Sequence, residues 1–428
     1  MENKTGKRKN GSLNGAERSW ILYDVGNSAF VLMVSTIFPI YFNYLAGQEG
    51  VSSADYLAIW GYAASIVTAI VALIGPVCGT IADYRGYKKP LFTLFLMIGA
   101  VGCAMLGLCS SWLAFIIIFV IAKVGFSTSL IFYDSMLGDV TTEDRFDKVS
   151  ADGYAWGYIG SCIPFVASLG IVLGKDRLGL SMQQAMIAAF VLVAVWWVAM
   201  TVPLLRRYRQ INYVEKHPHA VVAGVQRLWN TLKELKNDKK VLLFLVAYFF
   251  YIDGVYTIID MATAYGTALG LDTTGLLVAL LVTQIVAFPS AIIFGRLAGR
   301  VESWKLILVC VVAYTGVVVF AMFMTSQWQF WVLAVCVGMF QGGIQALSRS
   351  HFARIIPAEK SGEYFGLMDI CGKGASFVGT MLISIVSQVT GSANLGIGVM
   401  VIVFIAGLVF FIQSVSVENN SGVTWDNV

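Results

Sequence analysis

The sequence predicts an all-α membrane protein with twelve transmembrane helices in two bundles of six, and three observations support this fold class. Hydrophobic residues make up 58% of the 428-residue chain and charged residues only 13%, about half the charged share of an ordinary soluble domain. Twelve apolar runs are long enough to cross a bilayer, which takes about 20 residues. A polar segment, residues 206–240, divides these runs six and six.

The first apolar run follows a basic tail, residues 1–18. This run continues to about residue 46 and exceeds the apolar core of a cleaved signal peptide, which has roughly 7–15 residues. We therefore expect a retained first span. The twelve expected spans are 19–46, 56–82, 90–110, 112–138, 149–173, 184–205, 241–267, 274–298, 304–325, 328–348, 363–388 and 393–415. They form an N-terminal bundle (19–205) and a C-terminal bundle (241–415), followed by a tail (416–428).

The distribution of basic residues predicts the orientation in the bilayer. Of the 29 Lys and Arg residues, 25 lie in segments that an even number of spans places on one side. Only Lys175 and Arg177 lie in the opposite loops, and Lys123 and Lys373 lie inside spans. Because cytoplasmic loops carry the excess of Lys and Arg, both termini are expected in the cytoplasm.

The linker between the two bundles contains a basic amphipathic segment. Its apolar residues fall on one helical stripe, formed by Val221, Val225, Leu228, Trp229, Leu232 and Leu235. Such a helix lies along the membrane surface, with its apolar face in the interface. A solvated connector is the alternative interpretation of the same segment.

The stretch "GTIADYRGYKK" fits the pattern G-x-x-x-D-x-x-G-x-[KR] through Gly79, Asp83, Gly86 and Lys88. It falls between the second and third expected spans and resembles the signature loop of the major facilitator superfamily. The resemblance implies that this loop latches the two halves together on the cytoplasmic side. An acid can face the positive end of a helix dipole, so we expect Asp83 to contact the start of the eleventh span. A surface turn that merely follows the charge rule is the alternative.

Three further stretches narrow the resemblance. "YDVGNSAF" (23–30), "GGIQALSRSHFARIIP" (342–357) and "GEYFGLMDICGKG" (362–374) resemble segments of the vacuole-effluxer-like permeases, a branch that includes fungal autophagy-associated amino-acid exporters. The branch usually has Trp-Ala where this chain has Val25-Gly26. The superfamily resemblance covers about residues 19–415 and implies a secondary active transporter that moves a small solute by alternating access.

Several ionisable residues fall deep within the expected spans. Lys123 and Asp253 lie near mid-membrane, and Asp260 lies further out on the seventh span. Such charges cost about 2.5–3.5 kcal/mol on insertion scales and usually face a cavity or a partner. The superfamily fold implies that Lys123 and Asp253 face each other across the cavity in a pair that opens and closes, with Asp253 able to take up a proton. A static charge pair is the alternative.

Two further pairs share a helix face. Asp24 and Asn27 are three residues apart on the first span and could line the inner vestibule; the alternative is a helix-start acid satisfied by the basic tail. Asp369 and Lys373 are spaced i,i+4 with the acid first, which favours a local ion pair. If Lys373 instead faces the cavity, the basic residues would suit an amino acid or an organic anion.

Gln341 and Gln345 share a face of the tenth span and offer hydrogen bonds to a solute, or to a neighbouring helix. The seven cysteines are scattered singly and the three histidines lie in expected loops, so we expect no metal site, cofactor or catalytic residue, and no enzyme. The expected partners are a small solute, the lipid bilayer and protons, with no nucleic acid. We expect a monomer in the bacterial cell membrane. The alternative is a transport-inactive receptor or scaffold on the same fold.

Overall fold

The computed structural model describes residues 12–51, 53–215 and 220–420. These residues form helices joined by short connections, and the helix bounds are α1 (Gly15–Ser35), α2 (Ile37–Gln48), α3 (Ser53–Ala82), α4 (Lys88–Leu106), α5 (Trp112–Ser135), α6 (Leu137–Val140), η1 (Glu143–Arg145), α7 (Phe146–Leu173), α8 (Met182–Arg207), α9 (Ala220–Leu235), α10 (Lys239–Ala268), α11 (Thr273–Leu297), α12 (Ser303–Met322), α13 (Gln327–Ile355), η2 (Ala358–Lys360), α14 (Ser361–Thr390), α15 (Ala393–Gly398) and α16 (Met400–Asn420).

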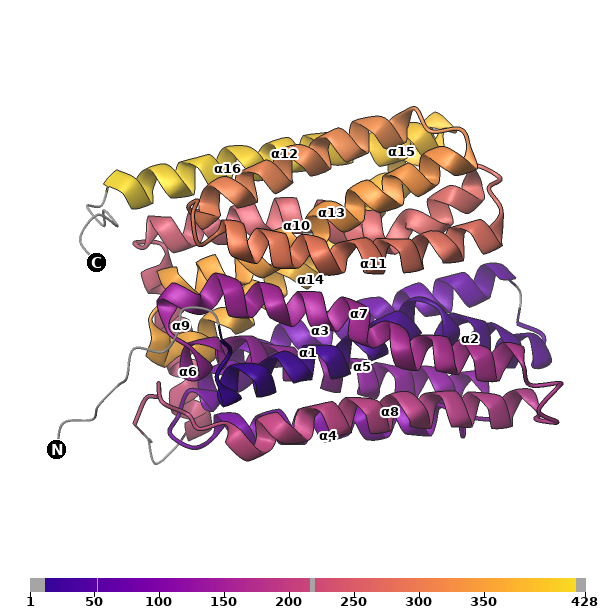
Figure 1. The fold of residues 1–428 in the computed structure, drawn as a ribbon, viewed down its shortest axis with the longest axis horizontal. Helices are drawn as coiled ribbons and strands as arrows, with labels where there is room; N and C mark the ends of the chain where they lie inside the picture. The colour runs from indigo at the N-terminus through magenta and orange to yellow at the C-terminus, as the bar shows by residue number, and fades with distance from the viewer. Residues whose placement is uncertain (1–11, 52, 216–219, 421–428) are drawn as a thin grey trace.

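The helices form two bundles, as the sequence predicted. Twelve segments are long and apolar enough to cross a membrane. Helices α1–α8 make the N-terminal half and α10–α16 the C-terminal half, which lie against each other in Figure 1. The halves meet along two seams, where α3 packs on α14 and α7 packs on α11.

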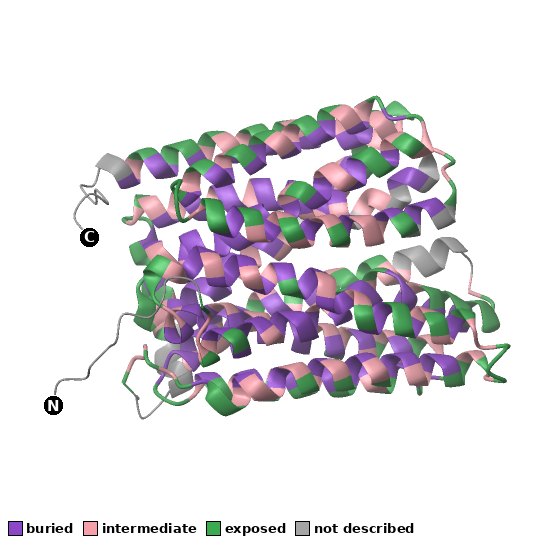
Figure 2. Cartoon of the chain, viewed as in Figure 1, coloured by how far each residue is buried: buried purple, intermediate pink, exposed green. Residues whose placement is uncertain are grey.

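Each half has a hydrophobic core of its own. Aromatic side chains such as Trp20 and Trp197 are buried in the N-terminal core, and Tyr251 and Tyr314 in the C-terminal core. Buried residues also gather where the two halves meet at the end of the molecule that holds both termini (Figure 2). Lipid-facing apolar side chains cover the outside, which is why many large hydrophobic residues are exposed.

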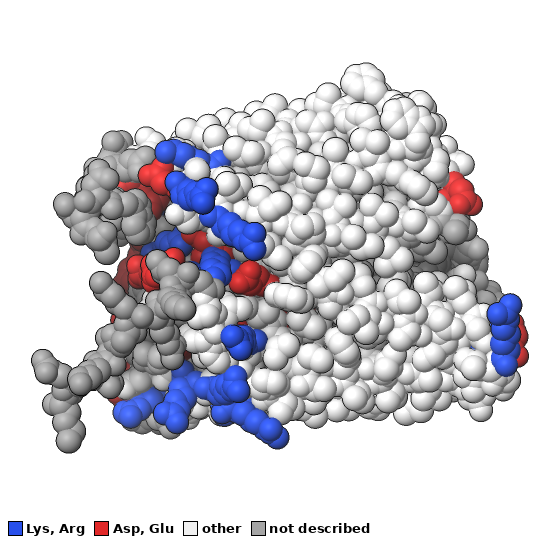
Figure 3. All heavy atoms as spheres, viewed as in Figure 1, with Lys and Arg blue, Asp and Glu red and all other residues white. Residues whose placement is uncertain are grey.

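Charged side chains gather at one end of the molecule, whereas the long flanks are almost free of them (Figure 3). We call this the basic end; it carries the connections after α3, α5, α8, α11 and α13. The positive-inside rule places the basic end in the cytoplasm.

Several expected spans differ from the observed helices, and the fourth and twelfth are interrupted at Met136 and Val399. The first span is broken at Thr36 between α1 and α2, because Pro39 has no amide hydrogen and its ring crowds the carbonyl of Ser35. The tenth span runs on to Ile355 as part of α13. Arg349 was therefore wrongly assigned to a loop; it belongs to a helix that continues because other helices satisfy its charge.

The amphipathic linker segment is helix α9, but its stripe is not uniformly covered by protein. Trp229 and Leu232 are exposed while Leu235 is buried in the C-terminal core. The side chains of residues 220–225, with Val221 and Val225, lie outside the described part. The position of α9 along the membrane surface stays a prediction.

The orientation is testable by cysteine labelling in a variant that lacks the seven native cysteines. Arg177→Cys, between α7 and α8, should react with a membrane-impermeant maleimide on intact cells. Asn237→Cys, at the basic end, should react only after the cells are permeabilised. The opposite labelling pattern would reverse the assignment.

Candidate functional site

The basic end closes around the carboxylate of Asp83, which directly follows α3 and is buried. Its two oxygens accept hydrogen bonds from the backbone amides of Gly362 (2.8 Å) and Glu363 (3.0 Å) in the first turn of α14. The structure thus places Asp83 at the start of the eleventh span, where the sequence led us to expect it. Burial raises the pKa of Asp83 to about 6, while the charge of Lys88 and the two amides act in the opposite direction. The carboxylate is therefore ionised at neutral pH.

Glycines allow α3 and α14 to touch along their backbones. A Cβ on Gly79 would overlap the carbonyl group of Gly362, and a Cβ on Gly362 would lie 2.5 Å from the carbonyl oxygen of Gly79. Gly86 has a φ of 81°, a left-handed conformation that glycine adopts freely. The turn at Gly86 leads the chain into α4 at Lys88.

Lys88 is fully buried at the same seam. Its ammonium donates to the hydroxyl of Ser361 (2.9 Å), on α14, and to the carbonyl of Ser135 (3.3 Å), on α5. The carboxylates of Asp83 and Asp139 both lie 3.7 Å from it. Lys88 therefore joins the two halves as well as neutralising two acids of its own half.

The linker helix α9 contributes a second cation. Arg227 donates to the carboxylates of Glu363 (2.8 Å), in the C-terminal half, and Asp83 (3.1 Å), in the N-terminal half. The sequence analysis did not single out this residue. The basic side of the amphipathic segment was the available signal.

A buried arginine forms the centre of the interface between the halves. Arg349 on α13 donates to the carboxylate of Asp134 (3.0 Å) and to the hydroxyl (2.9 Å) and carbonyl (3.0 Å) of Ser150. The carboxylate of Asp24 lies 3.4 Å away. These acceptors come from α5, α7 and α1 of the N-terminal half, although Arg349 belongs to the C-terminal half.

Aromatic rings complete the surroundings of the guanidinium. Its central carbon lies 4.5 Å from the ring centre of Trp20 and 4.4 Å from that of Tyr154. Gly153 leaves room for this arrangement, since a Cβ there would lie 2.6 Å from the Asp24 carboxylate and 3.2 Å from the guanidinium. The sequence analysis missed Arg349 as a site residue, although it lies inside the quoted motif "GGIQALSRSHFARIIP".

A second acid joins the halves along the α7–α11 side. Asp147, in the first turn of α7, accepts from the hydroxyls of Ser350 (2.5 Å) and Ser303 (2.7 Å) and from the guanidinium of Arg354 (2.6 Å). All three donors belong to the C-terminal half. Sequence reasoning gave no signal for Asp147 beyond its position before the fifth span.

Three of the expected polar site residues lie in or near this interface. Asn27 donates to the carboxylate of Asp24 (3.2 Å), so the two share a helix face as expected. Gln345 accepts a hydrogen bond from the hydroxyl of Tyr158 (2.9 Å) in the opposite half. Gln341 is buried on the same helix, and its side-chain oxygen accepts no hydrogen bond from the described residues.

The salt bridges of the described residues do not include the expected pair of Lys123 and Asp253, whose residues lie on α5 and α10 in opposite halves. Asp253 accepts hydrogen bonds from Thr257 and from the amide of Gly379, both 3.1 Å away in its own half. The ammonium of Lys123 lies 5.0 Å from the ring centre of Phe126. A pair of Lys123 and Asp253 that opens and closes stays a prediction.

Lys373 forms the local ion pair that its spacing predicted. Its ammonium contacts the carboxylate of Asp369 one turn earlier on α14. The same ammonium lies 3.5 Å from the carbonyl oxygen of Ser127 on α5. Lys373 therefore touches the other half while its charge is neutralised locally. The side chain of Asp260 lies outside the described part of the chain.

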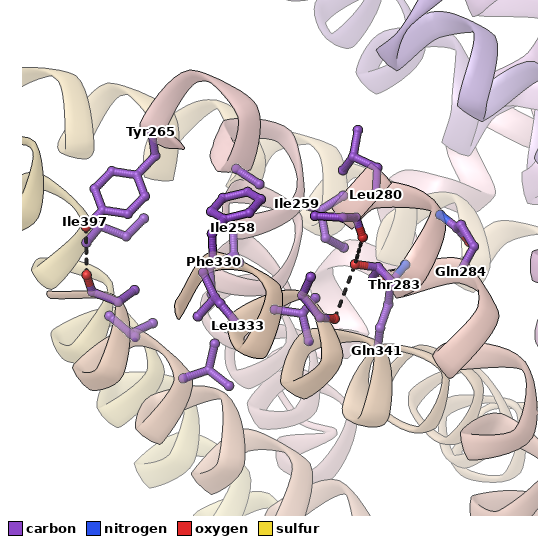
Figure 4. Close-up of a pocket in the computed structure, with 17 residues that line it drawn as sticks. Ile258, Ile259, Tyr265, Leu280, Thr283, Gln284, Phe330, Leu333, Gln341 and Ile397 are labelled. Carbon is purple, nitrogen blue, oxygen red and sulfur yellow. Dashed lines mark hydrogen bonds between the residues drawn. The ribbon is translucent and has the colours of Figure 1, made fainter. Parts of the chain in front are cut away.

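An apolar pocket with a cavity volume of about 60 Å³ lies inside the C-terminal half (Figure 4). It is lined by Ile258, Ile259, Ala262, Tyr265, Ala279, Leu280, Thr283, Gln284, Val317, Val318, Ala321, Phe330, Leu333, Ala334, Val337, Gln341 and Ile397. Gln284 and Gln341 lie at one end of the pocket, and Tyr265 and Ile397 at the other. Amide side chains therefore lie at one end of a pocket that is lined mainly by apolar residues. Among the described residues, no cluster of His, Cys, Asp or Glu could hold a metal ion.

The sequence matches a known family over most of its length. The family described as "Vacuole effluxer Atg22 like" matches residues 16–144 and 139–422. The chain belongs to this family.

Relatives of this family member include bacterial and fungal proteins. An uncharacterized MFS-type transporter, YxiO of Bacillus subtilis, is 42% identical over 398 residues, or 92% of this chain and 93% of the relative. Autophagy-related protein 22 of Yarrowia lipolytica is 24% identical over 297 residues, or 62% of this chain and half of the relative. These relatives support a transporter of the major facilitator type.

Solved structures of major facilitator transporters share the fold. The human organic anion transporter MFSD10 has a TM-score of 0.68 at 13% identity, over 92% of this chain and 98% of that chain. FucP in the outward conformation has a TM-score of 0.69 at 13% identity, over 94% and 97%. An outward-facing bacterial homologue of ferroportin also has a TM-score of 0.69, at 14% identity, over 94% and 98%. The predicted fold class is confirmed.

The close packing of α3 on α14 yields a test with a matched control on one helix. Gly362→Ala should push the seam apart and favour opening of the basic end, because its Cβ meets the backbone of Gly79. Gly374→Ala should have little effect, because no atom lies within 4 Å of a Cβ there. Distances between spin labels at the basic ends of α3 and α14 would report the change. Equal distance distributions in the two variants would contradict it.

Proposed function

We propose that this protein is a secondary active transporter that moves a small solute by alternating access, with the interface around Arg349 as its inner gate. The observation that carries the proposal is the reach of Arg349 from the C-terminal half to Asp134, Ser150 and Asp24 in the N-terminal half. The gate cannot open unless these contacts break. Opening therefore changes the charge environment of buried groups in both halves.

The hydrogen bonds that join the two halves in the described part of the chain support an inner-closed state. These hydrogen bonds lie between the basic end and the middle of the spans. Among them, the bonds from Tyr158 to Gln345 and from Lys373 to Ser127 lie furthest from the basic end. Such one-sided closure is what a rocking mechanism between two bundles requires. The solute would enter from the opposite side in this state.

The carboxylates at the gate favour coupling to protons. When Arg349 withdraws, Asp24 and Asp134 lose their shared cation. Removing one partner of a buried ion pair costs about 3–5 kcal/mol, and uptake of a proton or a cationic group by the acids offsets that cost. Asp253 is a further candidate proton site, because it is buried and its hydrogen-bond donors among the described residues are a hydroxyl and an amide.

The solute that fits best carries a carboxylate and an apolar part, as an amino acid or an organic anion does. Lys123 supplies positive charge on α5, a helix that packs against α14 of the opposite half. Gln341 offers a buried acceptor at the edge of the apolar pocket. We place the protein in the bacterial cell membrane as a monomer, since one chain contains both halves of the fold.

The function is tested by counterflow in liposomes that contain the purified protein and a panel of labelled amino acids and organic anions. The wild type should accumulate at least one labelled solute. Arg349→Gln should lower the exchange rate at least tenfold, because two buried carboxylates lose their cation. Arg206→Gln, which removes an exposed arginine at the end of α8, should leave the rate unchanged. No exchange with any solute would favour the receptor or scaffold.

Proton coupling at Asp253 makes a separate prediction. Asp253→Asn removes the titratable group while keeping its size and its acceptor for Thr257 and Gly379. Accumulation driven by a pH gradient should be lost, whereas counterflow of the same solute should persist within about twofold. If gradient-driven accumulation survives, Asp253 is not the coupling residue; if both activities disappear, its role is structural.

A further inference from the structure

A charged groove lies on the outer surface of the second seam, where α7 of one half meets α11 of the other. It is lined by Leu13, Arg18, Asp144, Arg145, Asp147, Lys148, Asp152, Trp156, Ile292, Ile293, Gly295, Arg296, Leu297, Ala298, Gly299 and Arg300. The two helices touch closely beside it, because a Cβ on Gly295 would lie 2.5 Å from the Cβ of Ala151. A molecule in this groove therefore contacts both halves at once.

The groove has an excess of positive charge, with five basic and three acidic side chains. Two of these charges are engaged elsewhere, since Arg145 binds Glu17 and Asp147 binds Arg354. Arg296 and Arg300 are exposed at the end of α11. They are the groups best placed to meet an anion that arrives from the membrane surface.

An apolar wall continues from the charged part toward the middle of the bilayer. Trp156 lies one turn after Asp152 on α7, is 47% exposed, and makes an edge-to-face contact with Phe288 of α11. Ile293 lies one turn before Arg296 and is 52% exposed. Tryptophan is enriched at the level of the lipid headgroups. The groove therefore has charged residues nearest the membrane surface and apolar residues deeper, in the same order as the headgroup and acyl chains of a phospholipid.

We propose that this groove binds an anionic phospholipid of the cytoplasmic leaflet, with its phosphate at Arg296 and Arg300 and an acyl chain along Trp156 and Ile293. Basic pockets between transmembrane helices on the cytoplasmic side bind acidic headgroups. Because the lipid contacts α7 and α11 together, it stabilises the state in which the basic end is closed. The inference depends on the orientation of the chain and not on which solute is carried.

Native mass spectrometry of the protein released from mixed micelles tests the site. The probes are phosphatidylglycerol and phosphatidylcholine at equal concentration. The wild type should retain phosphatidylglycerol in preference. The double variant R296Q/R300Q should lose that preference at least fivefold, since each basic residue near the surface contributes to the attraction of acidic lipid. The control K233Q/K236Q removes two exposed charges, one on α9 and one directly after it, outside the groove.

Two further arms separate the sources of the signal. Inorganic phosphate in excess should not displace the lipid, because the apolar wall contributes to binding; displacement would reduce the site to an anion site and overturn the proposal. Trp156→Ala should lower retention of phosphatidylglycerol with the arginines intact. Equal lipid loss in both double variants would also overturn it, since the effect would then follow net charge. Thermal unfolding of each variant in detergent verifies that the fold persists.

Discussion

A buried guanidinium is tolerated in a low-dielectric interior only where acceptors surround it, and this requirement organises the interface of the two halves. Arg349 belongs to the C-terminal half, yet its hydrogen-bond acceptors in the described structure, Asp134, Ser150 and Asp24, belong to the N-terminal half. Neutralising the arginine and closing the basic end are thus one event. Gly153 serves the same purpose, because a side chain there would collide with the carboxylate and the guanidinium that must approach.

The two seams reach closure by different chemistry despite their similar geometry. Along α3 and α14, the acid stands in the loop and its partners are helix amides, as Asp83 and the amide of Gly362 show. At the seam of α7 and α11, the acid stands on a helix, as Asp147 in the first turn of α7, and its donors are side chains of α12 and α13. Each seam therefore has a buried carboxylate that accepts from the opposite half.

Sequence reasoning predicted the features that hydropathy and turn chemistry determine. The twelve spans, the division at the linker and the position of Asp83 all follow from apolar run length and from a glycine-rich turn. Arg349 was missed because the count of basic residues treats each one outside the expected spans as a loop residue. That count takes no account of acids on other helices, which allow an arginine to lie inside a helix. The expected pair of Lys123 with Asp253 stays a prediction, because depth along a helix leaves its rotation undetermined. The break of the first span at Thr36 was not predicted, because it results from the backbone chemistry of Pro39, which an average of hydropathy does not include.

An ionic seam suits a gate better than an apolar one of equal area. Replacing a buried ion pair by packed hydrophobic groups is often neutral or stabilising, so the pairs of Lys88, Arg227 and Arg349 are not required for stability alone. When the halves separate, water solvates these charges or the solute pairs with them, and much of the lost interaction energy is recovered. Apolar surfaces that separate would instead be exposed to water at a free-energy cost of about 25 cal/mol per Å². In the gate that we propose, the charges therefore keep the closed and open states close in free energy. Arg227 couples the linker helix α9 to the closed state, because it donates hydrogen bonds to Asp83 and Glu363 on opposite sides of the seam.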